Sequence, residues 1–146
     1  MADHLPVDSN EDDAPPDLTR PAAALVLLAG LLHVVLGGAA LLGTPALEAN
    51  VKQIESNPDY GHLYFSLAVW GAIVLVLGFG ELAAAAAAMR RTEAGWLSAM
   101  LLAFLGLTIS FFSMAIFRVG ALVAIVLLFM ACFLLAYHSR RIARWP

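Results

Sequence analysis

Residues 94–137 read "AGWLSAMLLAFLGLTISFFSMAIFRVGALVAIVLLFMACFLLAY" and contain a single charged residue, Arg118. As one straight helix this block would be about 66 Å long, because an α-helix rises 1.5 Å per residue. The hydrocarbon core of a bilayer is only about 30 Å thick and is crossed by about 20 residues. We therefore expect the block to fold back at 117–120, where charge and glycine coincide. This predicts two membrane helices, near 95–116 and 120–138.

Two further apolar runs precede this block, at about 22–43 and 63–89. The chain is 62% hydrophobic and 13% charged, whereas a soluble domain is about 45–50% apolar and about 25% charged. Helices are the expected element, because a helix satisfies its own backbone hydrogen bonds where lipid offers none. The predicted fold is an all-α polytopic membrane protein: an antiparallel bundle of four transmembrane helices over 21–139.

The two ends of the chain read as polar tails. Residues 1–20 are acidic and proline-bearing and have few large apolar side chains. Such a segment cannot bury enough surface to offset its ordering entropy, so we expect a disordered tail. It lacks the basic start and cleavage site of a signal peptide. Residues 140–146 are basic and are predicted to form a second tail.

The basic residues predict the topology. With four spans both termini lie on one side, and that side carries six arginines against two basic residues on the other. Such a bias marks the cytoplasmic side. We therefore expect a multi-pass protein of the bacterial inner (plasma) membrane with both termini in the cytoplasm. The six arginines are Arg20, Arg90, Arg91, Arg140, Arg141 and Arg144. The two basic residues on the other side are Lys52 and Arg118.

The segment between the first two runs, 44–62, carries its own helix signal. Thr44 can cap a helix and Pro45 suits its first position. Three apolar side chains recur at spacings of four and three residues: Leu47, Val51 and Ile54. This predicts a short amphipathic helix lying on the outer membrane surface. The alternative is a plain extracellular loop.

Each predicted span has a stripe of small or polar residues at helical spacing. Small residues let membrane helices approach closely, so the four stripes should face one another. The glycines expected to pack helices are Gly30, Gly37, Gly71, Gly78 and Gly106. The stripes are Gly30, His33 and Gly37; Gly71, Gly78, Glu81 and Ala85; Ala99, Ala103, Gly106, Ser110 and Ser113; and Gly120, Ala124 and Ala131.

The same stripes predict a buried polar site made of His33, Glu81, Ser110 and Ser113. Glu81 is the only acid in the four runs. A charged carboxylate at this depth costs several kcal/mol, and burial disfavours the charged form, so we expect Glu81 to be protonated. One interpretation is a protonatable site in a small polar cavity. The other is a neutral acid that hydrogen-bonds serine, threonine or backbone and locks the bundle.

The predicted depths place Glu81 and His33 about 9 Å apart along the helix axes. A direct bond would need the helices to shift or Glu81 to reach outward. A bridging water is the simpler expectation.

We expect neither a cofactor nor a metal site. A haem with two histidine ligands needs both at one depth, and only His33 is central. No zinc spacing, nucleotide loop or nucleophile arrangement is visible, and the single cysteine, Cys132, excludes a disulfide within one chain. No basic patch suggests nucleic acid.

Three motifs carry a family resemblance: a glycine-flanked polar residue, a Trp-Gly pair with a glycine seven residues on, and a tryptophan after a short basic turn. They are Gly30, His33 and Gly37; Trp70, Gly71 and Gly78; and Trp96. Over about 23–138 the chain resembles a family of small uncharacterised four-helix integral membrane proteins, mainly actinobacterial. That family often has a histidine where Val74 stands here. The resemblance implies topology and no chemistry.

Together these observations predict a protein without catalytic activity, an accessory or structural component of a membrane assembly. The alternative is a small transporter or proton-conducting element that uses Glu81 and His33, and an integral membrane enzyme is the third possibility. The expected partners are the lipid bilayer and either other membrane subunits or a second copy.

Overall fold

The computed structural model describes residues 17–56 and 66–142, with side chains as far as Tyr137. The described residues form helices and no strand. The helices are α1 (Thr19–Leu41), α2 (Pro45–Glu55), α3 (Leu67–Met89) and α4 (Glu93–Ile142). Of these, α1, α3 and α4 are long and apolar enough to cross a membrane. The predicted disordered tail lies mostly outside the described residues.

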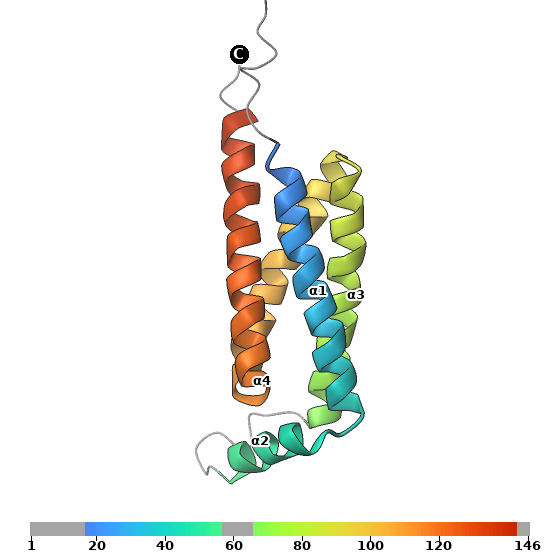
Figure 1. Cartoon of the computed structure of the whole chain (residues 1–146), viewed down its shortest axis with the longest axis vertical. Coiled ribbons are helices and arrows are strands. Elements are labelled where there is room, and N and C mark those ends of the chain that lie inside the picture. The colour runs from blue at the N-terminus through green and yellow to red at the C-terminus, as the bar shows by residue number, and fades with distance from the viewer. Residues whose placement is uncertain (1–16, 57–65, 143–146) are drawn as a thin grey trace, which may run out of the picture.

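Helix α4 is two helices joined at Arg118, whose φ of 17° and ψ of −89° are not helical. Figure 1 shows the chain reversing there, so that the two arms of α4 lie alongside each other. The reversal lies within the predicted turn, 117–120. We call the part before Arg118 the first arm and the part after it the second arm.

The helix ends differ from the predicted limits by a few residues. Helix α1 begins at Thr19 rather than 22, and the Thr19 N–H donates to Asp17 Oδ1 at 3.0 Å. Helix α3 begins after Ser66, whose hydroxyl accepts from Val69 N at 3.4 Å. Helix α4 extends to Ile142, beyond the predicted end of the last span at 138, and includes residues 140–142 of the predicted basic tail.

Two glycine pairs bring α1 and α3 into close contact. A Cβ built on Gly37 would lie 2.7 Å from Gly71 O, and one on Gly78 would lie 2.8 Å from Gly30 O. Real Cβ atoms do not approach backbone so closely, so only glycine fits. Since Gly30 meets Gly78 and Gly37 meets Gly71, the two helices run in opposite directions. Close approach through small residues is how helices associate in lipid.

The core is built from small side chains, and the large ones face outward. Alanine dominates the buried apolar positions, with Ala22, Ala85, Ala99 and Ala131 fully buried. The exposed surface is rich in Leu, Val and Phe. The most exposed of these on the helices are Val35, Val76, Phe104, Phe111, Val119 and Phe129. A contiguous exposed apolar surface of this kind marks contact with lipid or with another protein.

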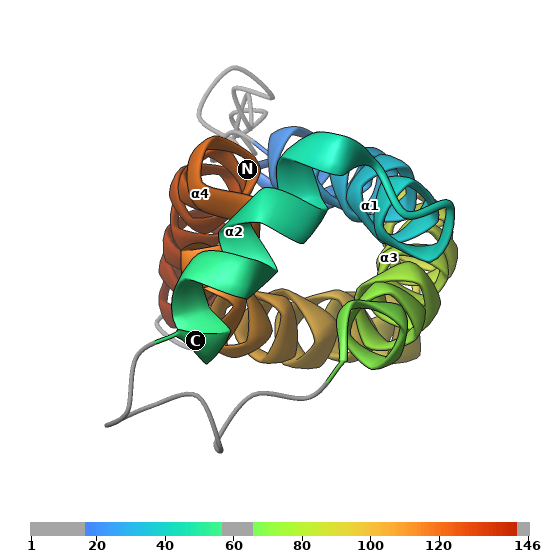
Figure 2. The ribbon, with the colours of Figure 1, turned by 90° about the horizontal axis from the view of Figure 1, so that it is seen from below.

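Helix α2 crosses one end of the bundle, as Figure 2 shows from that end. Its apolar residues Leu47, Val51 and Ile54 pack against a core cluster that includes Ile116 and Phe117. The bundle end therefore provides the apolar surface that this face covers, and the location of α2 on the outer membrane surface stays a prediction. Helix α2 does begin at Pro45, but Thr44 makes no side-chain cap bond.

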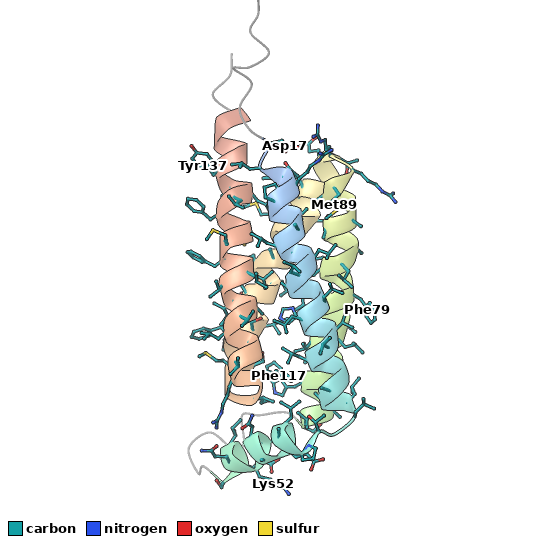
Figure 3. All side chains as sticks on the ribbon, in the orientation of Figure 1. Asp17, Lys52, Phe79, Met89, Phe117 and Tyr137 are labelled. Atoms are coloured by element: carbon teal, nitrogen blue, oxygen red, sulfur yellow. The ribbon has the colours of Figure 1, made fainter. Side chains whose placement is uncertain are left out.

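Figure 3 locates the two ends of the bundle by labelled residues. Lys52 lies on α2, and Phe117 lies at the same end within the bundle. Asp17, Met89 and Tyr137 lie at the opposite end. There, Arg91 forms an ion pair with Asp17 at 2.9 Å. Below we call these the α2 end and the terminal end.

Candidate functional site

The centre of the bundle contains a direct contact between His33 of α1 and Glu81 of α3. His33 Nδ1 and Glu81 Oε2 are 2.8 Å apart. The side chains are 2% and 0% exposed, so water does not reach the pair. The prediction that a water bridges the two side chains is therefore wrong.

The direct contact follows from the register and from side-chain direction. A Cβ built on Gly30 would lie 3.1 Å from Glu81 Cβ, so Glu81 sits beside Gly30, one helical turn before His33. The three residues from Gly30 to His33 correspond to an axial offset of about 4.5 Å, rather than the expected 9 Å. Side chains lean toward the N-terminus of their own helix. Because α1 and α3 are antiparallel, His33 and Glu81 lean toward each other.

Ser110 extends the contact to the first arm of α4. Its Oγ lies 2.9 Å from His33 Nε2, and the residue is 1% exposed. Ser113 is also buried, but its hydroxyl donates to the backbone oxygen of Ser110 at 3.3 Å. Of the four residues predicted for the site, three therefore form a hydrogen-bonded chain and Ser113 adjoins it. We call His33, Glu81 and Ser110 the polar cluster.

The second carboxyl oxygen, Glu81 Oε1, has no hydrogen-bond partner in the described structure. It lies against Gly106 in the space that a Cβ there would occupy. A Cβ on Gly106 would also lie 2.9 Å from Leu128 Cδ1. Gly106, expected to pack helices, thus also makes room for the carboxyl group.

When the acid proton lies between Glu81 Oε2 and His33 Nδ1, the polar cluster can hold its protons in two states without net charge. Either Glu81 is protonated and donates to Nδ1 of a neutral imidazole, or ionised Glu81 accepts from Nδ1–H of an imidazolium. In both states Nε2 carries a proton and donates to Ser110 Oγ. The proton can thus move between Glu81 and His33 without any change at Ser110.

A third state, an ionised Glu81 beside a neutral His33, would leave one negative charge in the core. Burying an unpaired charge is costly. Among the described residues, no hydrogen bond or ion pair joins the cluster to a lysine or arginine; Arg91 pairs with Asp17 and Arg118 with Gln53 instead. The uncharged states are therefore favoured.

This arrangement bears on whether Ser110 is a nucleophile. A serine, a histidine and a carboxylate in hydrogen-bond order are the parts of a nucleophilic triad, an arrangement that sequence reasoning missed. In such a triad, however, the histidine nitrogen facing the serine must accept its proton. In both uncharged states His33 Nε2 already carries one. The cluster is suited to hold a proton rather than to activate Ser110.

Apolar layers lie on both sides of the polar cluster. On the terminal side the layer is Val26, Ala29, Ala85, Ala103, Leu128 and Ala131. On the α2 side it is Ala40, Val74, Ile116, Phe117 and Ala121. Within residues 17–56 and 66–137, no three His, Cys, Asp or Glu residues lie close enough to hold a metal ion.

Comparison with known proteins gives a family. A family model described as a domain of unknown function, DUF7144, matches residues 18–140. Searches of curated proteins and of solved structures gave no match. The match covers the polar cluster, both glycine pairs and α2. The chain therefore belongs to the family of the domain of unknown function DUF7144.

Proposed function

We propose that the protein is a non-catalytic integral membrane protein that crosses the bacterial plasma membrane four times as an antiparallel bundle. The exposed apolar side chains of α1, α3 and both arms of α4 support this. The described basic residues divide between the ends: Arg20 lies at the start of α1 and Arg90 and Arg91 follow α3 at the terminal end, whereas Lys52 lies on α2 and Arg118 at the reversal of α4. The positive-inside rule then places both termini in the cytoplasm. An actinobacterial origin stays a prediction from the family resemblance.

Within the membrane we propose an accessory or structural role in a larger assembly. The observation that carries this is the burial of the polar cluster between two apolar layers. Its hydrogen bonds join α1, α3 and α4, each contributing about 1 kcal/mol when its partners are satisfied. A cluster of this kind fixes which helix faces meet, and it offers a substrate no opening.

The accessory role predicts a partner. Purification of the native protein in mild detergent, followed by mass spectrometry, should recover other membrane subunits in a fixed ratio. Glu81→Gln keeps the shape of the side chain, so the same subunits should accompany that variant. A chain that purifies alone after crosslinking in intact membranes would contradict the role.

One observation favours a second function, that of a small transporter or proton-conducting element. Glu81 Oε1 is fully buried without a partner, and the pair can shift a proton between two groups. Proton flux into proteoliposomes would test it. Flux in the wild type that Glu81→Gln abolishes, with the same melting temperature, would favour conduction over the accessory role.

A further inference from the structure

Three oxygen atoms lead from the polar cluster toward the α2 end. They are Ser110 Oγ, Ser113 Oγ and the backbone oxygen of Ile116, spaced every third residue along one face of the first arm. Residues at that spacing share a helix face. From Ser110 to Ile116 the axial distance is about 9 Å, at 1.5 Å per residue.

Helix α2 closes the far end of this row. Asn50 Nδ2 donates to Ile116 O at 2.8 Å, and Arg118 donates to Gln53 Oε1 at 2.6 Å. No residue of α2 is fully buried. It is thus the most weakly held of the described helices, since local opening starts where few apolar contacts are buried.

The terminal side of the cluster has no such row. The buried residues of the apolar clusters there are Ala, Val and Leu, whose side chains offer water no hydrogen bond. The polar groups buried on that side, Thr19 and Trp96 Nε1, lie farther from the polar cluster, close to the ends of their helices. In the first arm, Ala99 and Ala103 occupy the face that Ser110 and Ser113 occupy farther along, and both are fully buried. The polar cluster is therefore sealed differently on its two sides.

We infer that α2 is a gate and that, when it moves off the bundle end, protons reach the His33–Glu81 pair from the α2 end alone. The ligand is a proton, carried by water along Ser113 and Ser110. Uptake converts the uncharged pair into a protonated acid beside an imidazolium. A site that opens to one side reports conditions on that side and does not conduct across the membrane.

Few charged groups face this pair. Among the described residues, α1 contributes His33, α3 contributes Glu81, and the first arm of α4 contributes only hydroxyl groups. The charged residues of α2, Glu48, Lys52 and Glu55, are exposed, and Lys52 points away from the bundle in Figure 3. Arg118 lies at the gate, bonded to Gln53.

The inference rests on the proposed membrane location but not on the accessory role, so a failed search for partners would leave it standing. The test uses cysteine accessibility in proteoliposomes of the full chain carrying Cys132→Ala. Ser113→Cys probes the α2 side, and Ala103→Cys probes the terminal side. The probe is methanethiosulfonate ethylammonium, applied to both sides and followed by mass spectrometry.

Ser113→Cys should react slowly in the otherwise unchanged protein. Adding Asn50→Ala and Gln53→Ala should speed the reaction about tenfold or more, as expected when two hydrogen bonds that hold the gate are lost. Lys52→Ala, on the exposed face of α2, is the matched control and should leave the rate unchanged. Ala103→Cys should stay unreactive in every background.

Two results would overturn the gate. One is an equal rate for Ser113→Cys with and without the Asn50 and Gln53 changes. The other is an equal increase in the reaction rate of Ala103→Cys, which would mean that the whole bundle loosens. If Ala103→Cys fails to fold, Ala99→Cys serves in its place, and a melting curve checks each variant.

Discussion

Glu81 Cβ lies beside Gly30, one turn before His33, and from there its carboxyl group reaches His33 Nδ1 at 2.8 Å. Two glycines of α1 set this register. The backbone of α3 packs closely against Gly30 and, seven residues farther along α1, Gly71 packs against Gly37. The close approach of α1 and α3 and the central hydrogen bond are therefore one structural feature. Changing either should disturb the other.

The glycine contacts predict that a larger side chain destabilises the protein on one face of α3 and not on another. Gly78→Leu would push a side chain into Gly30 and Val34, whereas Val76 is 72% exposed. Overpacking costs about 1–3 kcal/mol, and more where backbone must move. Gly78→Leu should lower the melting temperature in detergent, while Val76→Leu should hardly change it. Equal melting of the two variants would refute the packing of α1 on α3.

Gly106→Ala should disturb the polar cluster itself. The added Cβ would occupy the place of Glu81 Oε1, so the carboxyl group must turn away from His33 or the first arm must move. We expect a loss of about 1–3 kcal/mol, the range for a buried polar group deprived of its partner. Gly80→Ala is the control, because its Cβ would make only an ordinary contact, 3.5 Å from Leu102. Unfolding of both in detergent with the same midpoint would show that Gly106 has no special role.

The protonation of Glu81 is tested by substitution. Glu81→Gln keeps the shape and can donate to His33 Nδ1 as the protonated acid does, so stability should be almost unchanged. Glu81→Leu removes the bond and leaves His33 Nδ1 without a partner, which should cost about 1–3 kcal/mol. Reversible unfolding of the two variants provides the comparison. If Glu81→Gln is as unstable as Glu81→Leu, the carboxyl group is ionised in the folded protein.

The proposed topology is tested with an impermeant thiol reagent in intact cells carrying Cys132→Ala. A cysteine at Ser56, at the exposed end of α2, should be labelled, and one at Ser9 should not. Lysis should make Ser9→Cys reactive. The opposite pattern would place the termini outside.

Hydropathy and spacing were enough to predict much of the fold. The reversal at Arg118 follows from length, and the helix in 44–62 follows from its apolar spacing and Pro45. The location of α2 could not be predicted in this way. An apolar helix face suits a bundle end as well as a lipid surface, and only the three-dimensional shape distinguishes the two.

The polar cluster, too, could be predicted only in part from the sequence. Helical spacing placed His33, Glu81 and Ser110 on inward faces, but depth was judged from the middle of each span. The side chains lean toward each other, so that Glu81 Cβ lies beside Gly30, and the separation of the two side chains is smaller than the depth of the residues suggests. The unpartnered Glu81 Oε1 depends on side-chain orientation, which spacing does not specify.

The state of the His33 ring tests the central claim most directly. ¹⁵N NMR of the protein in bilayers, assigned with His33→Gln, reports which ring nitrogen carries a proton. With Glu81 protonated, Nε2 should bear the only ring proton and donate to Ser110, while Nδ1 accepts from Glu81. A proton on Nδ1 with a bare Nε2 would contradict this account. Either the acid proton would then lie on Glu81 Oε1 or the cluster would carry a negative charge, and in both cases Nε2 could act as a base toward Ser110.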